Sequence, residues 1–145
     1  LKEGIGLAIG TDGPASNNCL DMFREMFLVA GLQKLKESDA SAMDANEVLY
    51  MATVGGARAM GLDECDTLEA GKYADLIILD MSKPEMQPVC NVTKNIVYSG
   101  SKADVKLTMI AGNILYEDGR FNIGESLEVI IHEVNKANQE IGDVR

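Results

Sequence analysis

The sequence contains no tryptophan, a single histidine and only three cysteines. Cys19, Cys65 and Cys90 lie far apart and form no C-x-x-C pair. We therefore expect neither a disulfide framework nor a thiolate zinc site, and this cysteine usage fits a reducing cytoplasm. Because a catalytic zinc takes about three protein ligands, one histidine is too few for a histidine-rich metal centre built from this chain alone.

Basic residues are also scarce. Thirteen Lys and Arg stand against 23 Asp and Glu, for a net charge of −10. This balance argues against nucleic acid and anionic membranes as partners, since both require a basic surface. Nothing in these 145 residues resembles a signal peptide or an apolar stretch of membrane-spanning length.

What remains is typical of a globular protein. The 145 residues are 46% hydrophobic, enough for one ordinary domain with a core. The first residue is Leu1 rather than Met, and a strand-like run follows within a few residues. We expect the sequence to be a piece of a longer protein.

The first third of the sequence has the pattern of a β/α unit. Residues 4–11, "GIGLAIGT", form a short apolar run between glycines, typical of a parallel strand buried on both faces. Asn18, followed three residues later by Asp21, predicts the start of a helix that ends near Lys36. Its predicted apolar side includes Leu20, Phe23 and Phe27.

A second helix is predicted after Asp44, which forms a capping signature with Glu47. Gly55 and Gly56 lie inside it, either as a weak point or as small residues that let the helix approach a sheet closely. Gly61 is expected to terminate this helix.

The pattern changes after residue 62. Short strands are predicted at 75–80 and 94–100, and a hairpin over 105–118 with its turn at Gly112-Asn113. Asp118-Gly119 predicts another turn. A closing helix over 125–140 carries an apolar stripe of Leu127, Ile130, Ile131 and Val134. We accordingly divide the sequence into 1–62, 63–124 and 125–145.

Asp12 is the main candidate functional residue. Asp12-Gly13 is a common turn dipeptide, which is one interpretation. The other is that Asp12 ends a buried parallel strand, where (β/α) barrels place catalytic groups, and that "DGPASNN" is longer than a plain turn requires. A carboxylate there suits a metal ligand or a base that accepts a proton from metal-bound water.

The other polar candidates have structural interpretations as well. His132 lies on the predicted final helix, where we expect a solvated side chain rather than a ligand. Ser16 and Asn17 either face a substrate or satisfy the loop backbone. In "GKYAD", Lys72 and Asp75 are expected to be turn and edge residues.

Three blocks in this order resemble the C-terminal third of the amidohydrolase superfamily: "GTDGPASNNCLDMFREM" (10–26), "ANEVLYMATVGGARAMGL" (45–62) and "LEAGKYADLIILD" (68–80). The branch they resemble most is that of the 5-methylthioadenosine/S-adenosylhomocysteine deaminases, with the related triazine chlorohydrolases and guanine deaminases. The resemblance covers nearly the whole sequence through Phe121.

The resemblance implies a mixed α/β fold: the last strand and helices of a (β/α)8 metal-dependent hydrolase barrel, plus part of a β-sandwich. Residues 4–11 would be the eighth barrel strand, and Asp12 would bind a divalent metal, zinc or alternatively iron, and deprotonate the attacking water. The other metal ligands would lie upstream. A full barrel needs about 250 residues, so this sequence is expected to be an inactive fragment.

The implied activity is hydrolytic deamination of an adenosine-type purine nucleoside. Ser16 and Asn17 would contact this substrate. A chlorohydrolase, a guanine or cytosine deaminase of the same superfamily, and a non-catalytic interaction module remain alternatives. The expected partners are the missing part of the barrel or a second copy of the chain, since residues 4–11 have few candidates to pair with.

Overall fold

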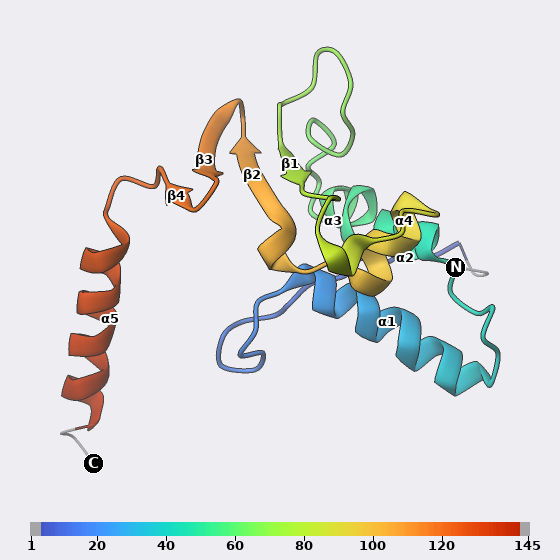
Figure 1. Cartoon of the computed structure of the whole chain (residues 1–145), viewed down its shortest axis with the longest axis horizontal. Helices are drawn as coiled ribbons and strands as arrows, with labels where there is room; N and C mark the ends of the chain where they lie inside the picture. The colour runs from blue at the N-terminus through green and yellow to red at the C-terminus, as the bar shows by residue number, and fades with distance from the viewer. Residues whose placement is uncertain (1–3, 143–145) are drawn as a thin grey trace.

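The computed structural model describes residues 4–142 as a group of helices beside a small sheet, with a helix at the C-terminal end (Figure 1). The elements in chain order are α1 (Met22–Glu37), α2 (Ala45–Ala52), α3 (Val54–Ala59), β1 (Leu76–Leu79), η1 (Pro84–Met86), α4 (Val92–Ser99), η2 (Lys102–Asp104), β2 (Val105–Ile110), β3 (Asn113–Glu117), β4 (Arg120–Phe121) and α5 (Leu127–Gly142). Within residues 4–142, no helix has the length and apolar character needed to cross a membrane.

The hydrophobic core lies between α1, α2 and α4. Its buried side chains are Phe23, Met26, Ala30, Ala45, Val48 and Val97. On α1 these residues are spaced by three and four positions, which places them on one helical face. The prediction that Phe27 lies on the buried side was wrong: it stands four residues after Phe23, but its side chain is 53% exposed.

Helix α1 begins later than the sequence predicted. The Asp21 Oδ1 atom accepts the Phe23 N–H at 3.0 Å, so Asp21 is the N-cap. Asn18 lies exposed in the bend before the helix, and the prediction that it caps α1 was wrong. Asn and Asp are both good N-cap residues, and Asp21 caps α1 because its side chain is the one that reaches the second N–H of the helix.

The strand predicted at 94–100 was also wrong, because Val92–Ser99 forms helix α4. Asn91 caps it by accepting the Lys94 N–H at 2.9 Å. The β-branched residues Ile96 and Val97 favour a strand locally, but as a helix they pack against α1 and α2. Tertiary packing overrides the weak local preference here.

The capping box predicted for the second helix is confirmed, with Asp44 and Glu47 both making their bonds at the start of α2. The helix is interrupted at Thr53 and resumes as α3. Gly61 ends α3 with a φ of +71°, as predicted. Its N–H donates to the Arg58 carbonyl and the Leu62 N–H to the Ala57 carbonyl, which is a Schellman ending.

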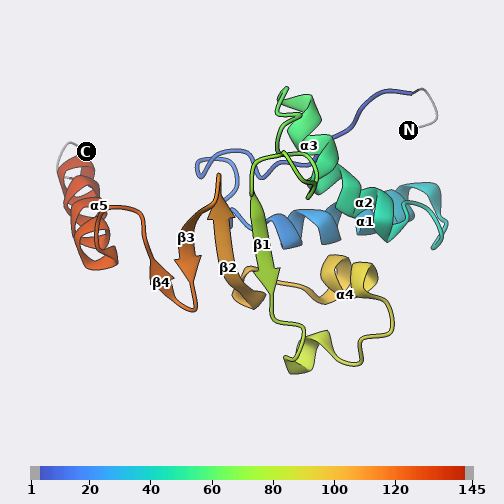
Figure 2. The same ribbon diagram turned by 90° about the horizontal axis from the view of Figure 1, so that it is seen from above.

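The sheet is a four-stranded antiparallel meander in the order β1-β2-β3-β4, and Figure 2 shows it beside the helices. Its first pair includes Leu76 opposite Met109, which confirms the strand predicted at 75–80. The predicted hairpin is also confirmed, but its turn is Ala111-Gly112, both at positive φ, rather than Gly112-Asn113. The following turn is Asp118-Gly119, as predicted.

The strand predicted at 4–11 is not formed. The described residues of this segment have no regular secondary structure, and Ile5 and Leu7 are exposed. In the described part of the chain, the only paired strands are those of the β1-β2-β3-β4 sheet, so residues 4–11 have no strand beside them. It is held instead by the helices, where the Ile9 N–H donates to the Met51 carbonyl at 3.1 Å.

The helix predicted at 125–140 is confirmed as α5, which lies beyond β4 at one end of the molecule (Figures 1 and 2). Its apolar stripe, however, does not join the core. Leu127, Ile131 and Val134 are each about half exposed or more. An amphipathic helix with an uncovered apolar face is typical of an element that packs against something else.

Candidate functional site

The candidate site is the loop between the Ile9 contact and helix α1. Asp12 stands in this loop with a φ of +57°, a left-handed conformation that aspartate tolerates better than most residues. Its Oδ1 atom accepts the Gly13 N–H at 2.7 Å, and the side chain is exposed to solvent. The structure therefore shows the turn role and leaves the carboxylate open to a ligand.

Ser16 lies next to Asp12. The Ser16 hydroxyl and, to a smaller extent, the Gly13 N–H lower the pKa of the Asp12 carboxyl below its ordinary value. The hydroxyl also donates to the Gly13 carbonyl at 3.1 Å. At neutral pH the carboxylate is thus ionised, which is the form that binds a cation or accepts a proton.

Asn17 is directed toward helix α1 rather than toward Asp12. Its Nδ2 donates to Glu25 Oε1 at 2.6 Å, and its Oδ1 accepts the Cys19 N–H at 3.1 Å. Both ends of the amide are therefore engaged in fastening the loop. Of the two predicted substrate contacts, the structure brings Ser16 to Asp12 and uses Asn17 to hold the loop.

Asp12 can supply one ligand to a divalent metal, and the described residues bring no further ligand set to it. A carboxylate offers about four lone-pair sites, so Asp12 retains room for a metal after accepting the Gly13 N–H. Among residues 4–142, no three His, Cys, Asp or Glu side chains come together in a way that could hold an ion. His132 lies exposed on α5, as the sequence predicted. Any metal centre at Asp12 would need ligands from another part of the protein.

Sequence reasoning missed an ion cluster centred on Asp66, whose side chain is only 3% exposed. The Arg58 Nε donates to Asp66 Oδ2 at 2.8 Å, and Lys72 binds the other oxygen. The cluster fastens α3 to the loop that leads into β1. Nothing in the spacing of these residues signals it, because the burial of Asp66 arises only when the loop folds back.

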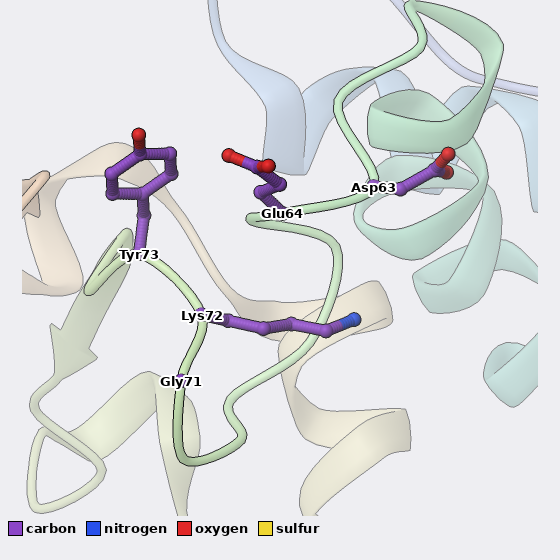
Figure 3. Close-up of a pocket in the computed structure, with 5 residues that line it drawn as sticks. All are labelled: Asp63, Glu64, Gly71, Lys72 and Tyr73. Atoms are coloured by element: carbon purple, nitrogen blue, oxygen red, sulfur yellow. The ribbon is translucent and has the colours of Figure 1, made fainter.

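Lys72 was predicted to be a turn residue of no catalytic importance. It does follow the turn at Gly71, with φ +96°, and its side chain runs across the loop in Figure 3. There it lines an open hollow together with Asp63, Glu64 and Tyr73 (Figure 3). Asp12 and Ser16 do not line this hollow, so we do not assign the chemistry to it.

The ion cluster at Asp66 leads to a prediction about how the stability of the protein depends on pH. Lys72 first and Arg58 second lower the pKa of Asp66 to about 2. A folded-state pKa below the unfolded value means that this stabilisation is present above about pH 4 and is lost as the pH falls toward 2.

We therefore expect the Asp66→Asn variant to lose less unfolding free energy than the unmodified chain between pH 4 and pH 2. Urea denaturation of both proteins at several pH values measures this difference. Parallel losses in the two proteins across that interval would contradict the assigned ion cluster.

Comparison with known proteins places this fold and loop in a family. Residues 1–115 match the Amidohydrolase family. The chain therefore belongs to the amidohydrolase family. This confirms the superfamily resemblance identified from the three sequence blocks.

Its curated relatives are named as deaminases. The chain is 43% identical over 141 residues to a 5′-deoxyadenosine deaminase of Methanosarcina mazei, covering 97% of this chain and 32% of that protein. It is 47% identical over 121 residues to a 5-methylthioadenosine/S-adenosylhomocysteine deaminase of Desulfovibrio desulfuricans, covering 83% of this chain and 28% of the relative. The chain thus spans about a third of the length of the relatives it matches.

Solved structures agree with this placement. An adenosine deaminase from Xanthomonas campestris with bound zinc superimposes with a TM-score of 0.92 at 36% identity, covering 98% of this chain and 32% of that one. A triazine hydrolase variant superimposes with a TM-score of 0.84 at 25% identity, covering 93% and 30%. The mixed α/β arrangement seen here is therefore one that amidohydrolases share.

Proposed function

We propose that the chain is the C-terminal part of a longer metal-dependent amidohydrolase that hydrolytically deaminates adenosine-type nucleosides. The substrate class is that of 5-methylthioadenosine and S-adenosylhomocysteine. The observation that carries the proposal is Asp12, an exposed, ionised carboxylate in a chain that superimposes over 98% of its length on a zinc-bearing adenosine deaminase. The relatives named as deaminases support the substrate class.

In this proposal, residues 4–11 are the last strand of the barrel, within a unit of residues 1–62. Residues 63–124 contribute to the β-sandwich, and residues 125–145 form a separate helical end. The exposure of Ile5 and Leu7 supports the first assignment, because an apolar strand gains stability by pairing on both sides. Ile77 and Ile78, half exposed on β1, support a further layer over the sheet.

The chemistry follows from the position of Asp12. A divalent metal, zinc or alternatively iron, lowers the pKa of a bound water to about 7. Asp12 would hold the metal through one carboxylate oxygen and accept the proton that the water gives up. The water oxygen would add to C6 of the adenine ring, and the amino group would leave as ammonia after receiving the proton that Asp12 had accepted. The other ligands would come from the part of the protein upstream of this chain.

We assign Ser16 and Asn17 to the substrate side of this loop. The Ser16 hydroxyl, which is exposed beside Asp12, would contact the nucleoside. Asn17 would act mainly by fixing the loop through Glu25 and the Cys19 N–H. We further propose that the protein works in the cytoplasm. We also propose that it pairs with a second copy, since the apolar stripe of α5 is uncovered.

A second candidate is a hydrolase of another ring substrate on the same scaffold. The triazine hydrolase superposition supports it, but at 25% identity compared with 43% and 47% for the named deaminases. Substrate contacts upstream of this chain would decide between a chlorohydrolase, a guanine or cytosine deaminase and an adenosine-type deaminase. A free-standing interaction module is disfavoured by the exposed apolar residues at both ends of the chain.

The experiment is to read the coding sequence upstream of Leu1, express the longer protein and assay it for ammonia release. We expect an H-x-H motif and two further histidines upstream, and ammonia from 5-methylthioadenosine in the presence of zinc. The 145-residue chain alone should release none, because its described residues hold no further ligand set. A coding sequence that begins at Leu1, or a longer protein inactive on all the purine nucleosides tested, would overturn the proposal.

A further inference from the structure

The interruption between α2 and α3 frees backbone carbonyls that a continuous helix would use. The last four carbonyls of an α-helix lack partners within the helix. Thr53 satisfies two of them, since its hydroxyl donates to the Leu49 carbonyl at 2.7 Å and its N–H to the Tyr50 carbonyl at 3.2 Å. The Met51 carbonyl instead accepts the Ile9 N–H at 3.1 Å. The break in the helix therefore provides the acceptor that anchors the segment before Asp12.

Gly55, in the first turn of α3, lies against the same segment. It is buried, and a Cβ atom built on it would be 2.6 Å from the Leu7 carbonyl oxygen and 3.2 Å from that of Tyr50. Ordinary van der Waals contact begins at 3.4 Å, so with alanine here the Leu7 carbonyl would have to retreat by about 0.8 Å. Both neighbouring atoms belong to the backbone, which yields less readily than the end of a side chain.

Glycine is unfavourable inside a helix, so its presence here requires a reason. Gly56, the next residue, does not have the same reason, because its added Cβ would meet only the Met51 carbonyl at 3.7 Å. The close approach is thus specific to Gly55. The backbone that Gly55 approaches is that of residues 4–11.

The two contacts fall on adjacent parts of one short stretch. Leu7 meets Gly55, Ile9 bonds to Met51 and packs against the core, and Asp12 follows three residues later. Because only a few residues separate residues 7 and 9 from residue 12, a displacement of the backbone at residue 7 or 9 also shifts Asp12. Metal ligands tolerate errors of only about 0.2 Å in their distances, less than the shift that a side chain at residue 55 would impose.

We propose that Gly55 is a positioning residue for Asp12: it lets the backbone of residues 7–9 seat against the break between α2 and α3, and so sets where the carboxylate stands. This inference rests on the function proposed above for Asp12. It assigns Gly55 no contact with substrate or metal.

The test compares Gly55→Ala with Gly56→Ala in the longer, zinc-loaded enzyme. Both variants replace a glycine by alanine in the same helix turn, and only the first creates the clash. We expect Gly55→Ala to lower kcat by about 10- to 100-fold with KM little changed, since misplacement of a catalytic group by an ångström has effects of this size. Gly56→Ala should keep kcat within about twofold. A purely structural role would lower the melting temperature of Gly55→Ala without this loss of kcat, and that result would overturn the proposal.

Hydrogen exchange at the Ile9 amide of the longer protein tests the contact without any measurement of activity. We expect strong protection in the unmodified chain and in Gly56→Ala, and exchange at least about tenfold faster in Gly55→Ala. Should Gly55→Ala fail to fold, the unmodified chain decides: an Ile9 amide that exchanges as fast as a free peptide overturns the proposal. A protected Ile9 amide in a protein without deaminase activity would overturn the proposed function while leaving the contact intact.

Discussion

Replacement of Asp12 by asparagine in the longer enzyme is expected to lower kcat by about 10²- to 10⁴-fold, the range that loss of a general base covers. Asparagine preserves the local structure, because it tolerates positive φ and its oxygen still accepts the Gly13 N–H. The loss would therefore report on the charge of the carboxylate and not on the fold of the loop. Ammonia release measures kcat, and zinc content per protein measures the lost ligand.

Asp39→Asn is the matched control. Asp39 also closes a turn, accepting the Ser41 N–H and the Ser41 hydroxyl, each at 2.7 Å. As at Asp12, a serine hydroxyl and a backbone N–H lower the pKa of its carboxyl. We expect Asp39→Asn to leave both kcat and zinc content unchanged. If Asp12→Asn retains more than about a tenth of the activity, Asp12 is a turn residue only.

The largest effect on stability is expected from Lys83→Met. Lys83 forms an ion pair with Asp104, at 3.2 Å between Nζ and Oδ1, and the Asp104 side chain is fully buried. The other oxygen, Oδ2, accepts the Ser101 N–H at 2.7 Å. Oδ1 accepts no hydrogen bond among the described residues, so Lys83 compensates it through its charge and not through a hydrogen bond. Removing Lys83 would leave a buried carboxylate uncompensated.

Breaking a buried ion pair costs about 3 to 5 kcal/mol, and we expect about 3 kcal/mol here because Lys83 is partly open to water. Urea denaturation of the 145-residue chain measures the loss. Adding Asp104→Asn to Lys83→Met should restore part of it, since a neutral amide is less costly to bury than a charge.

Lys106→Met provides the comparison. Lys106 pairs with Asp80 at a longer distance, 3.7 Å, and both side chains are more exposed than Asp104. An exposed pair contributes less than about 1 kcal/mol. Equal destabilisation by Lys83→Met and Lys106→Met would show that the burial of Asp104 does not govern the effect.

The sequence by itself determined those features that depend on neighbours a few residues apart. The capping box of Asp44 and Glu47, the Gly61 ending of α3 and the turn at Asp118-Gly119 are formed as predicted. Each uses local hydrogen bonds or a positive φ that few residue types allow. The order of the three motif blocks identified the family for the same reason: it requires only the sequence.

Only the tertiary structure decided the features that depend on contacts distant in sequence. Val92–Ser99 is a helix because Val97 packs against α1 and α2, although its β-branched residues favour a strand. Residues 4–11 form no strand because no described strand lies beside them to complete the hydrogen bonds.

In the candidate site, too, some features could be predicted from the sequence and others only from the tertiary structure. Asp12 could be named from a loop that follows an apolar run, since that pattern is local. The seating of Leu7 against Gly55, the bond from Ile9 to Met51 and the burial of Asp66 could not. These contacts join segments that are apart in the sequence, and their geometry exists only once the helices have packed.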